Sequence, residues 1–263
     1  MTRRRHLRNL ALLPGLLVAV VAVAGPWLVP SDPMLIVDLP YGSASAERWL
    51  GTDHAGRDVW HQILAGGRPL VVVPLVAVTL TVLIGTATGM FAAFLGGAVD
   101  AVVSRLDTIA LAIPAILVLL LLLHSWGSHA GTLIVAILIA SVPFVSRLAR
   151  AATLQAMNAG YVEQAIGLGA GTVTVVRREI LPNIIGPVIA DAGTRLAIAI
   201  TLTAVTGFLG FDSGQANWGA MVNQNFEGMA LSAWGVLVPA VLLAVLAVSA
   251  NLFLDRLAER MAP

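Results

Sequence analysis

The sequence predicts an all-α polytopic membrane protein of six transmembrane helices, with both termini on the same side of the membrane. Hydrophobic residues make up 58% of the 263 residues and charged residues only 11%, whereas soluble domains carry about a quarter of charged residues. The apolar residues also gather in long stretches, and arginines gather in alternate segments between these stretches. A chain of this kind has the bilayer as its solvent.

The six stretches approach the roughly 20 apolar residues that a helix needs to cross the hydrocarbon core. The predicted spans are about 10–29, 70–95, 106–123, 132–145 (continuing as a helix through Arg150), 184–208 and 234–254. The chain is accordingly divided into a cytoplasmic tail, a first transmembrane helix, an extracytoplasmic segment with an interfacial helix, and a five-helix core with a cytoplasmic loop at 158–182. These parts comprise residues 1–9, 10–29, 30–69 and 70–263.

The arginines predict the orientation. Eleven of them fall on the face of the two termini: Arg3, Arg4, Arg5, Arg8, Arg105, Arg147, Arg150, Arg177, Arg178, Arg256 and Arg260. Only Arg48, Arg57 and Arg68 fall on the opposite face. Because positive loops stay inside, both termini are predicted to be cytoplasmic. The arginine-rich start could also begin a signal peptide, but its apolar run is too long and no cleavage site stands out, so a retained anchor helix is expected.

A polar island separates the fourth and fifth spans on the predicted cytoplasmic face. It predicts a short helix over 161–168, and then a reversal over 169–171, because glycine adopts positive φ at little cost. Thr172 is expected to act as the N-cap of a second helix that ends at Ile180, and Pro182 to break that helix and start the fifth span. Spacing alone favours equally a rigid lever and a simple connecting loop.

Glu163, Ala165 and Gly169 occupy positions 1, 3 and 7 of a pattern that closes with Leu181-Pro182. This pattern resembles the EAA loop of the membrane-spanning subunits of bacterial ABC importers, although Gln164 replaces the middle alanine. In that family the loop forms a coupling helix that docks on the ATPase subunit. The resemblance therefore implies that an ATPase-coupling loop is formed by Tyr161, Glu163, Ala165, Gly169, Gly171, Leu181 and Pro182.

Further motifs resemble the dipeptide, oligopeptide and nickel branch of these permeases, and specifically its second permease subunit. They occur in order over about residues 45–260 and include Gly51-Thr-Asp53, Gly56-Arg-Asp58, Arg105-Leu-Asp107, Arg147-Leu-Ala-Arg150 and Asn217-Trp-Gly219. The resemblance implies a type I ABC importer permease fold in the bacterial inner membrane. It also implies a second homologous permease, two ATP-binding subunits and an extracytoplasmic substrate-binding protein as partners. ATP and Mg would be bound by the partner subunits, so no cofactor and no enzymatic activity are expected in this chain. The expected cargo is a dipeptide or oligopeptide, with nickel or another non-peptide substrate as the alternative.

Asp191 and Arg195 are ionisable residues inside the fifth span. They are four residues apart and therefore share one helix face. Charges inside a membrane usually face the bundle interior and pair, since each costs about 2.5–3.5 kcal/mol on insertion scales. A self-neutralising ion pair is the simpler interpretation, and a polar lining of the translocation path is the functional one.

The segment predicted to be extracytoplasmic carries a charged cluster made of Asp53, Arg57 and Asp58, with His54 beside it. We interpret it as a structural brace, with a docking surface for a binding protein as the alternative. No ligand spacing in it predicts a metal site.

Other classes of function are less consistent with the sequence. The glycines at 167–171 follow no strand and lack a Walker lysine, which argues against ATP binding. An intramembrane enzyme would need catalytic groups on adjacent spans, and a secondary transporter would often show an internal repeat, which is not seen. The sequence predicts contact with membrane lipid and no nucleic-acid partner.

Overall fold

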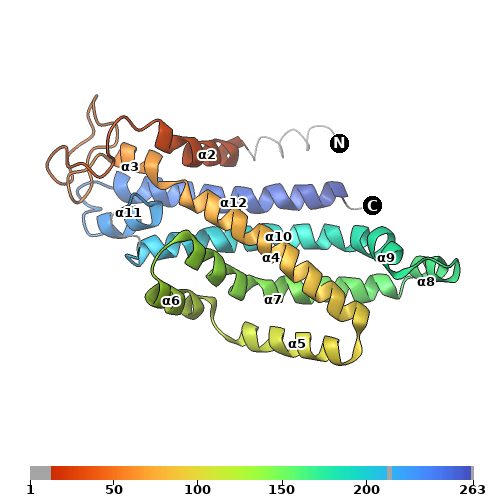
Figure 1. Cartoon of the computed structure of the whole chain (residues 1–263). Helices are drawn as coiled ribbons and strands as arrows, with labels where there is room; N and C mark the ends of the chain where they lie inside the picture. Colours follow the sequence, from red (N-terminus) through yellow and green to blue (C-terminus); the bar gives the residue numbers. More distant parts are fainter. Residues whose placement is uncertain (1–12, 212–214, 262–263) are drawn as a thin grey trace. The chain divides into compact units, whose positions relative to one another are not determined.

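The computed structural model describes residues 13–211 and 215–261, and in this part of the chain helices joined by loops, the longest over residues 28–58, form the structure (Figure 1). In the described residues, the backbone also forms two isolated antiparallel β-bridges, one between Ile36 and Arg57 and one between Thr52 and Asp58. The predicted tail, 1–9, lies outside the described residues. The elements follow in the order α2 (Leu13–Ala24), η1 (Gly25–Trp27), α3 (Val59–Gly66), α4 (Pro69–Leu95), α5 (Gly97–Ala112), α6 (Ala115–Trp126), α7 (Ala130–Met157), α8 (Gly160–Gly167), α9 (Thr172–Val175), η2 (Val176–Ile180), α10 (Leu181–Phe208), α11 (Trp218–Asn225) and α12 (Trp234–Met261).

Four apolar helical stretches are long enough to cross a membrane in the described part of the chain. They are Val59–Leu95, Ala130–Met157, Thr172–Phe208 and Trp234–Glu259. A fifth span is formed if α5 and α6 cross together, and Leu13–Trp27 is a shorter apolar helix. The all-α membrane fold is thus confirmed, while the count of six spans and the orientation of the termini stay predictions.

The predicted third span, 106–123, is not one straight helix. α5 and α6 meet at an angle of 81°, and Ile113 between them has extended backbone, with φ −90° and ψ 121°. Proline disfavours the helical conformation in the residue before it, so Pro114 imposes this backbone on Ile113. Pro74, Pro143, Pro187 and Pro239 instead lie inside continuous helices.

Pro182 does not break the helix before the fifth span, so that prediction was wrong. Helical backbone continues from α9 through the π-helical turn η2 into α10, and Leu181 has φ −56° and ψ −45°. Proline lacks an N–H donor, and the π-helical turn η2 already interrupts the regular α-helical hydrogen bonding just before Pro182. Pro182 is the second residue of α10 and is accommodated there.

Packing divides the chain into two compact units. Unit 1 comprises residues 1–76, 122–134 and 196–250, and unit 2 comprises residues 77–121, 135–195 and 251–263. The long helices α4, α7, α10 and α12 contribute residues to both units.

Unit 1 holds α2 and α3 close together through small residues. A Cβ atom added to Gly25 would overlap the carbonyl oxygen of Leu64, and one added to Gly67 would lie 2.6 Å from the Cα of Ala22. The ring of Trp218, fully buried in α11, donates a 2.7 Å hydrogen bond from Nε1 to the carbonyl oxygen of Ile63. The N-terminal helix, the extracytoplasmic segment and α11 therefore form one packed assembly.

Unit 2 contains the crossing of α4 and α7. A Cβ atom added to Gly85 would lie 2.6 Å from the Cβ of Val145, and one added to Gly89 would overlap the carbonyl oxygen of Ser146. Small residues let two helix backbones approach closely. The Gly85-x-x-x-Gly89 pattern is therefore a packing seam of this crossing.

Candidate functional site: the α8–α9 loop and its surroundings

The α8–α9 loop turns sharply at Gly169. This residue has φ +85°, and a Cβ atom there would meet nothing within 4 Å. The turn is closed by Ala170, whose backbone N–H donates a 3.0 Å hydrogen bond to the carbonyl oxygen of Ala165. Glycine is needed at position 169 for its backbone freedom and not for lack of space.

The start of α9 differs from the prediction. Gly171 occupies the N-cap position, with extended backbone at φ −70° and ψ 156°, and its carbonyl oxygen accepts hydrogen bonds from the N–H groups of Thr174 and Val175. Thr172 is the first helical residue and is not the N-cap. Glycine is also a favoured N-cap residue, so the N-cap lies at Gly171, one position before the predicted Thr172.

The base of the loop is anchored in a buried apolar cluster. Its members come from α7, α8, α9, η2 and α10 and are Ala156, Val162, Val175, Ile180 and Ile184, each at most 5% exposed. Leu181 and Ala170 pack against this cluster. The loop therefore has a rigid base that continues directly into α10.

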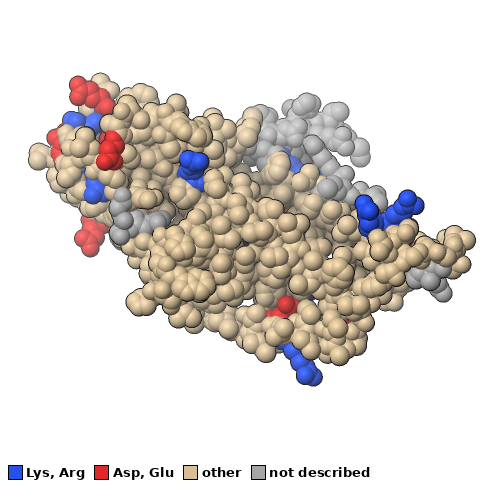
Figure 2. All heavy atoms as spheres, in the orientation of Figure 1, with Lys and Arg blue, Asp and Glu red and all other residues tan. Residues whose placement is uncertain are grey.

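The tip of the loop is open to its surroundings. Leu168 is 82% exposed and Val173 is 70% exposed, although both are apolar. Arg177 and Arg178 in η2 are also exposed, and Figure 2 shows basic side chains beside α9. An apolar tip flanked by positive charge has the features of a surface that binds another protein.

The residues of the predicted coupling loop take different places in this arrangement. Tyr161 is 39% exposed on α8, and Ala165 is half-buried on the same helix. Gly169 and Gly171 form the reversal, whereas Leu181 and Pro182 lie in the first turn of α10. Glu163 belongs to α8, but its side chain lies outside the part of the chain that the structure describes.

Asp191 and Arg195 form the ion pair that their spacing suggested. Both nitrogen–oxygen distances between them are 3.1 Å, and their side chains are 20% and 12% exposed respectively. The guanidinium of Arg195 also lies 4.3 Å from the ring centroid of Phe144 on α7. The pair is thus held between two helices of unit 2, and its place on a translocation path stays a prediction.

A polar contact between α5 and α7 was not predicted from the sequence. Arg150 pairs with Asp100, and the Nη2 of Arg147 donates a 2.7 Å hydrogen bond to the hydroxyl of Thr108. Asp107 lies between these contacts and is only 7% exposed. The available signal was the position of Asp107 inside the predicted third span, which makes it a further intramembrane carboxyl group.

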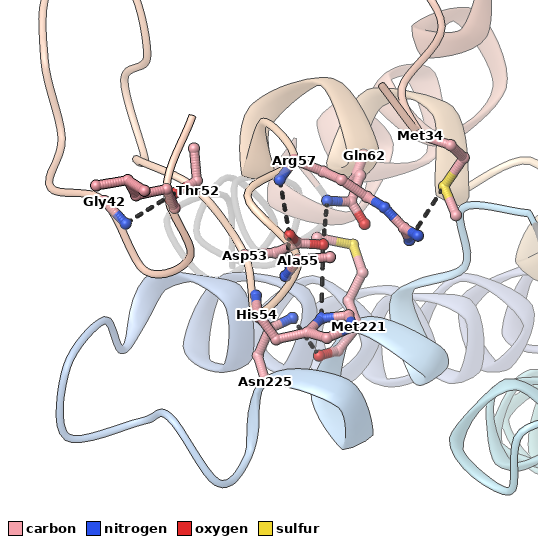
Figure 3. Close-up of polar contacts among 11 residues, drawn as sticks. Met34, Gly42, Thr52, Asp53, His54, Ala55, Arg57, Gln62, Met221 and Asn225 are labelled. Carbon is pink, nitrogen blue, oxygen red and sulfur yellow. Dashed lines mark hydrogen bonds and ion pairs between the residues drawn. The ribbon is translucent and has the colours of Figure 1, made fainter. Parts of the chain in front are cut away.

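In the segment predicted to be extracytoplasmic, the buried carboxylate of Asp53 forms a brace (Figure 3). Its Oδ1 accepts 2.8 Å hydrogen bonds from the backbone N–H groups of Ala55 and Arg57, and its Oδ2 accepts a 2.9 Å bond from Nε2 of Gln62 on α3. The N–H of His54 donates to Oδ1 of Asn225 on α11, at 2.9 Å. These contacts tie the segment to two helices, as the interpretation as a structural brace requires.

The described residues hold no candidate metal site. No group of three or more histidine, cysteine, aspartate or glutamate side chains is arranged there to hold an ion. His54 and Asp53 approach each other, with 3.6 Å between Nδ1 and Oδ2, but two residues provide fewer ligands than metal sites in proteins use.

Comparison with known proteins gives the family. The family model described as "binding-protein-dependent transport system inner membrane component" matches residues 85–263, which include α5, α7 and the whole α8–α9 loop. The chain belongs to this family. The permease therefore works in the inner membrane as one component of a larger transport system, and it is not an enzyme in its own right.

Curated relatives match almost the whole permease. It is 32% identical to the probable D,D-dipeptide transport system permease protein DdpC of Escherichia coli K12, over 94% of this chain and 84% of that protein. It is 30% identical to the glutathione transport system permease protein GsiD of Pectobacterium atrosepticum, over 99% and 88% of the two chains. The same identity relates it to the dipeptide transport system permease protein DppC of Bacillus subtilis, over 99% and 84%.

Solved structures share the fold of the permease at lower identity. A chain of the MetNI methionine ABC transporter in an inward facing conformation has a TM-score of 0.55 and 21% identity, covering 73% of this chain and 94% of that one. A chain of an amino acid ABC transporter has a TM-score of 0.53 at the same identity. The predicted resemblance to ABC importer permeases is thus confirmed for both the sequence and the fold.

Proposed function

We propose that this permease forms half of the translocation path of an ATP-driven importer for short peptides. Relatives named for D,D-dipeptide, dipeptide and glutathione transport support a peptide cargo. Its partners would be a second homologous permease, two ATPase subunits that bind ATP and Mg, and an extracytoplasmic binding protein that delivers the cargo. No observation in the described residues favours nickel over a peptide.

The structure of the α8–α9 loop supports coupling to an ATPase. A docking element must expose apolar surface to its partner and must be rigidly joined to the part that it moves. Leu168 and Val173 provide the exposed surface, and the buried cluster around Ile180 and Ile184 joins the loop to α10. A movement of the docked loop would therefore be passed to α10 as a rigid element.

The transport cycle follows from this connection. Closure of the ATPase dimer on ATP would displace the loop and, with α10, open the path to the outside. Hydrolysis and release would reverse the displacement. The free energy of ATP would reach this chain through the differential binding of the loop in the two states.

Cross-linking from the tip of the loop tests the docking. The chain contains no cysteine, so Leu168→Cys and Val173→Cys each introduce a unique attachment point for a maleimide–benzophenone reagent. In the assembled transporter, irradiation is expected to link both positions to an ATPase subunit. Leu231→Cys is the matched control, since Leu231 is 75% exposed and lies on the predicted extracytoplasmic face. Failure of both loop positions to react with an ATPase in an intact complex contradicts the docking.

Uptake measurements test the cargo separately. A strain lacking the gene is compared with its parent for uptake of a labelled dipeptide, a longer peptide and nickel, with and without depletion of ATP. Selective loss of ATP-dependent peptide uptake is the expected result. Loss of nickel uptake alone would show that the cargo is nickel and not a peptide. The proposed coupling to an ATPase would then still stand.

A further inference from the structure

Unit 1 contains a cavity of about 530 Å³. It lies beside the junction of α3 and α4, and its size is within the roughly 300–1,000 Å³ of sites that hold small ligands. Its walls are mostly apolar and include Pro26, Ala65, Pro69, Val72, Val73 and Ala130. A site of this kind binds an apolar group and fixes it with a few polar contacts.

Two opposite charges line the same cavity. Arg68 is exposed and stacks over Trp27, with its guanidinium carbon 5.4 Å from the ring centroid. Among the described residues its guanidinium makes no hydrogen bond and no ion pair, so its donors remain available. Asp32 contributes a carboxylate, of which Oδ1 accepts a 2.9 Å bond from the N–H of Met34. The cavity thus offers a cation and an anion to a ligand that carries both charges.

The surroundings of the cavity have the chemistry of a membrane interface. Trp27, which Arg68 stacks over, is 71% exposed at the end of the first apolar helix. Val72 lines the cavity and, with Leu75 and Val76, belongs to the exposed apolar start of α4. Tryptophan is enriched at the level of lipid headgroups, and exposed aliphatic side chains of a spanning helix contact acyl chains. An exposed tryptophan next to exposed aliphatic side chains is typical of the level of the lipid headgroups.

We propose that this cavity binds phosphatidylethanolamine from the outer leaflet, with the phosphate on Arg68 and the ammonium on Asp32. Arginine matches phosphate oxygens with two parallel donors. An anionic headgroup would gain the same contact with Arg68 but would lack a partner for Asp32. The proposal is independent of the cargo and of the coupling loop.

Lipid binding to the purified permease complex tests the proposal. The complex is incubated with equal amounts of phosphatidylethanolamine and phosphatidylglycerol, and bound lipid is counted by native mass spectrometry. The wild type is expected to retain phosphatidylethanolamine preferentially. Arg68→Gln removes a charge-assisted contact and is expected to lower this retention about tenfold, while Arg68→Lys keeps most of it.

Two further variants make the test specific. Asp32→Asn removes only the partner of the ammonium, so phosphatidylethanolamine and phosphatidylglycerol are expected to bind equally. Arg48→Gln is the matched control, because Arg48 lies in the same segment, pairs with Asp38 at 2.5 Å and does not line the cavity. It should retain lipid like the wild type.

The outcomes distinguish a lipid from a soluble ligand. Glycerophosphoethanolamine carries the headgroup without acyl chains and is expected not to displace the bound lipid, because it lacks the contact with the apolar walls. Full displacement by this compound would overturn a lipid site in favour of a soluble zwitterion. Unchanged retention in Arg68→Gln, or an unchanged lipid preference in Asp32→Asn, would overturn the proposal.

Discussion

Gly169 shows how one residue determines the shape of the α8–α9 loop. Its backbone has φ +85° and its Cβ position is open, so a substitution at this position acts through backbone strain and charge alone. Asparagine and aspartate tolerate the left-handed region better than other residues, and β-branched residues tolerate it worst.

Because strain and charge can be introduced separately at position 169, three substitutions are expected to affect transport differently. Gly169→Asp is expected to leave the permease in the membrane and to abolish transport, because it adds a charge to the docking tip. Gly169→Asn has the same shape without the charge and should keep much of the activity, whereas Gly169→Val should lose it through strain. ATP-dependent uptake is measured together with the amount of permease in the membrane. Full activity of both Gly169→Asp and Gly169→Val would refute a coupling role for this turn.

Asp53 holds the extracytoplasmic segment in the same residue-specific way. Its buried carboxylate accepts three hydrogen bonds, and hydrogen bonds to charged groups contribute about 1.5–3 kcal/mol each. Asp53→Asn is therefore expected to lower the midpoint of thermal unfolding clearly, followed by near-ultraviolet circular dichroism. Asp38→Asn is the control, because Asp38 is in an exposed pair with Arg48, which contributes at most about 1 kcal/mol. Equal midpoints for the two variants would show that the brace does not stabilise the fold.

At the scale of helices, α4 and α7 in unit 2 approach closely through small residues. The crossing of α4 and α7 at Gly89 leaves no room for a methyl group beside the carbonyl oxygen of Ser146. Atoms forced into a packed contact of this kind cost about 1–3 kcal/mol.

Gly89→Ala is accordingly expected to destabilise the permease by an amount in this range. Gly186→Ala in α10 of the same unit is the matched control, since nothing lies within 4 Å of its added Cβ. That control is expected to be neutral or slightly stabilising, because alanine favours helix over glycine. Retention of folded protein after heating in detergent, judged by size-exclusion chromatography, compares the two. A loss in Gly186→Ala as large as that in Gly89→Ala would contradict the assignment of the seam.

The prolines show a limit of predicting helices from the length of apolar runs. An apolar run at 106–123 reads as one span, yet the helix breaks at Ile113-Pro114 because proline controls the residue before it. At Pro182, directly after the π-helical turn η2, the same residue type leaves the helix intact, as it does inside α4, α7, α10 and α12. The effect of each proline depends on its register within a helix, which sequence periodicity does not define.

For the molecule as a whole, the Asp191–Arg195 pair offers a test of the translocation path. Removal of one partner of a buried pair leaves an uncompensated charge and costs about 3–5 kcal/mol, whereas removal of both is often tolerated. We expect Asp191→Asn or Arg195→Gln alone to reduce the amount of folded permease. The double variant should restore it.

Transport by the double variant then decides the role of the pair. If the pair borders the path, uptake or substrate preference changes although the amount of permease is normal. Normal uptake with an unchanged preference among peptides would show that the pair only neutralises itself. Both measurements use the complete transporter in membranes.

Composition and arginine distribution were enough to predict a helical membrane protein and to locate its polar segments, because burial in lipid restricts which residues a span can contain. The motif with Glu163, Gly169 and Pro182 likewise indicated the family, whereas the coupling role of the loop stays a prediction. Only the tertiary structure showed that Gly171 begins α9, that Ile180 and Ile184 anchor the loop, and that Asp53 bonds to Gln62. The same holds for the cavity at Arg68 and the burial of Asp107 between α5 and α7. The surrounding lipid or water restricts the residue type at each position separately and so leaves a pattern that can be read in the sequence. Packing and hydrogen bonding instead depend on which residues, distant in the sequence, the fold brings together.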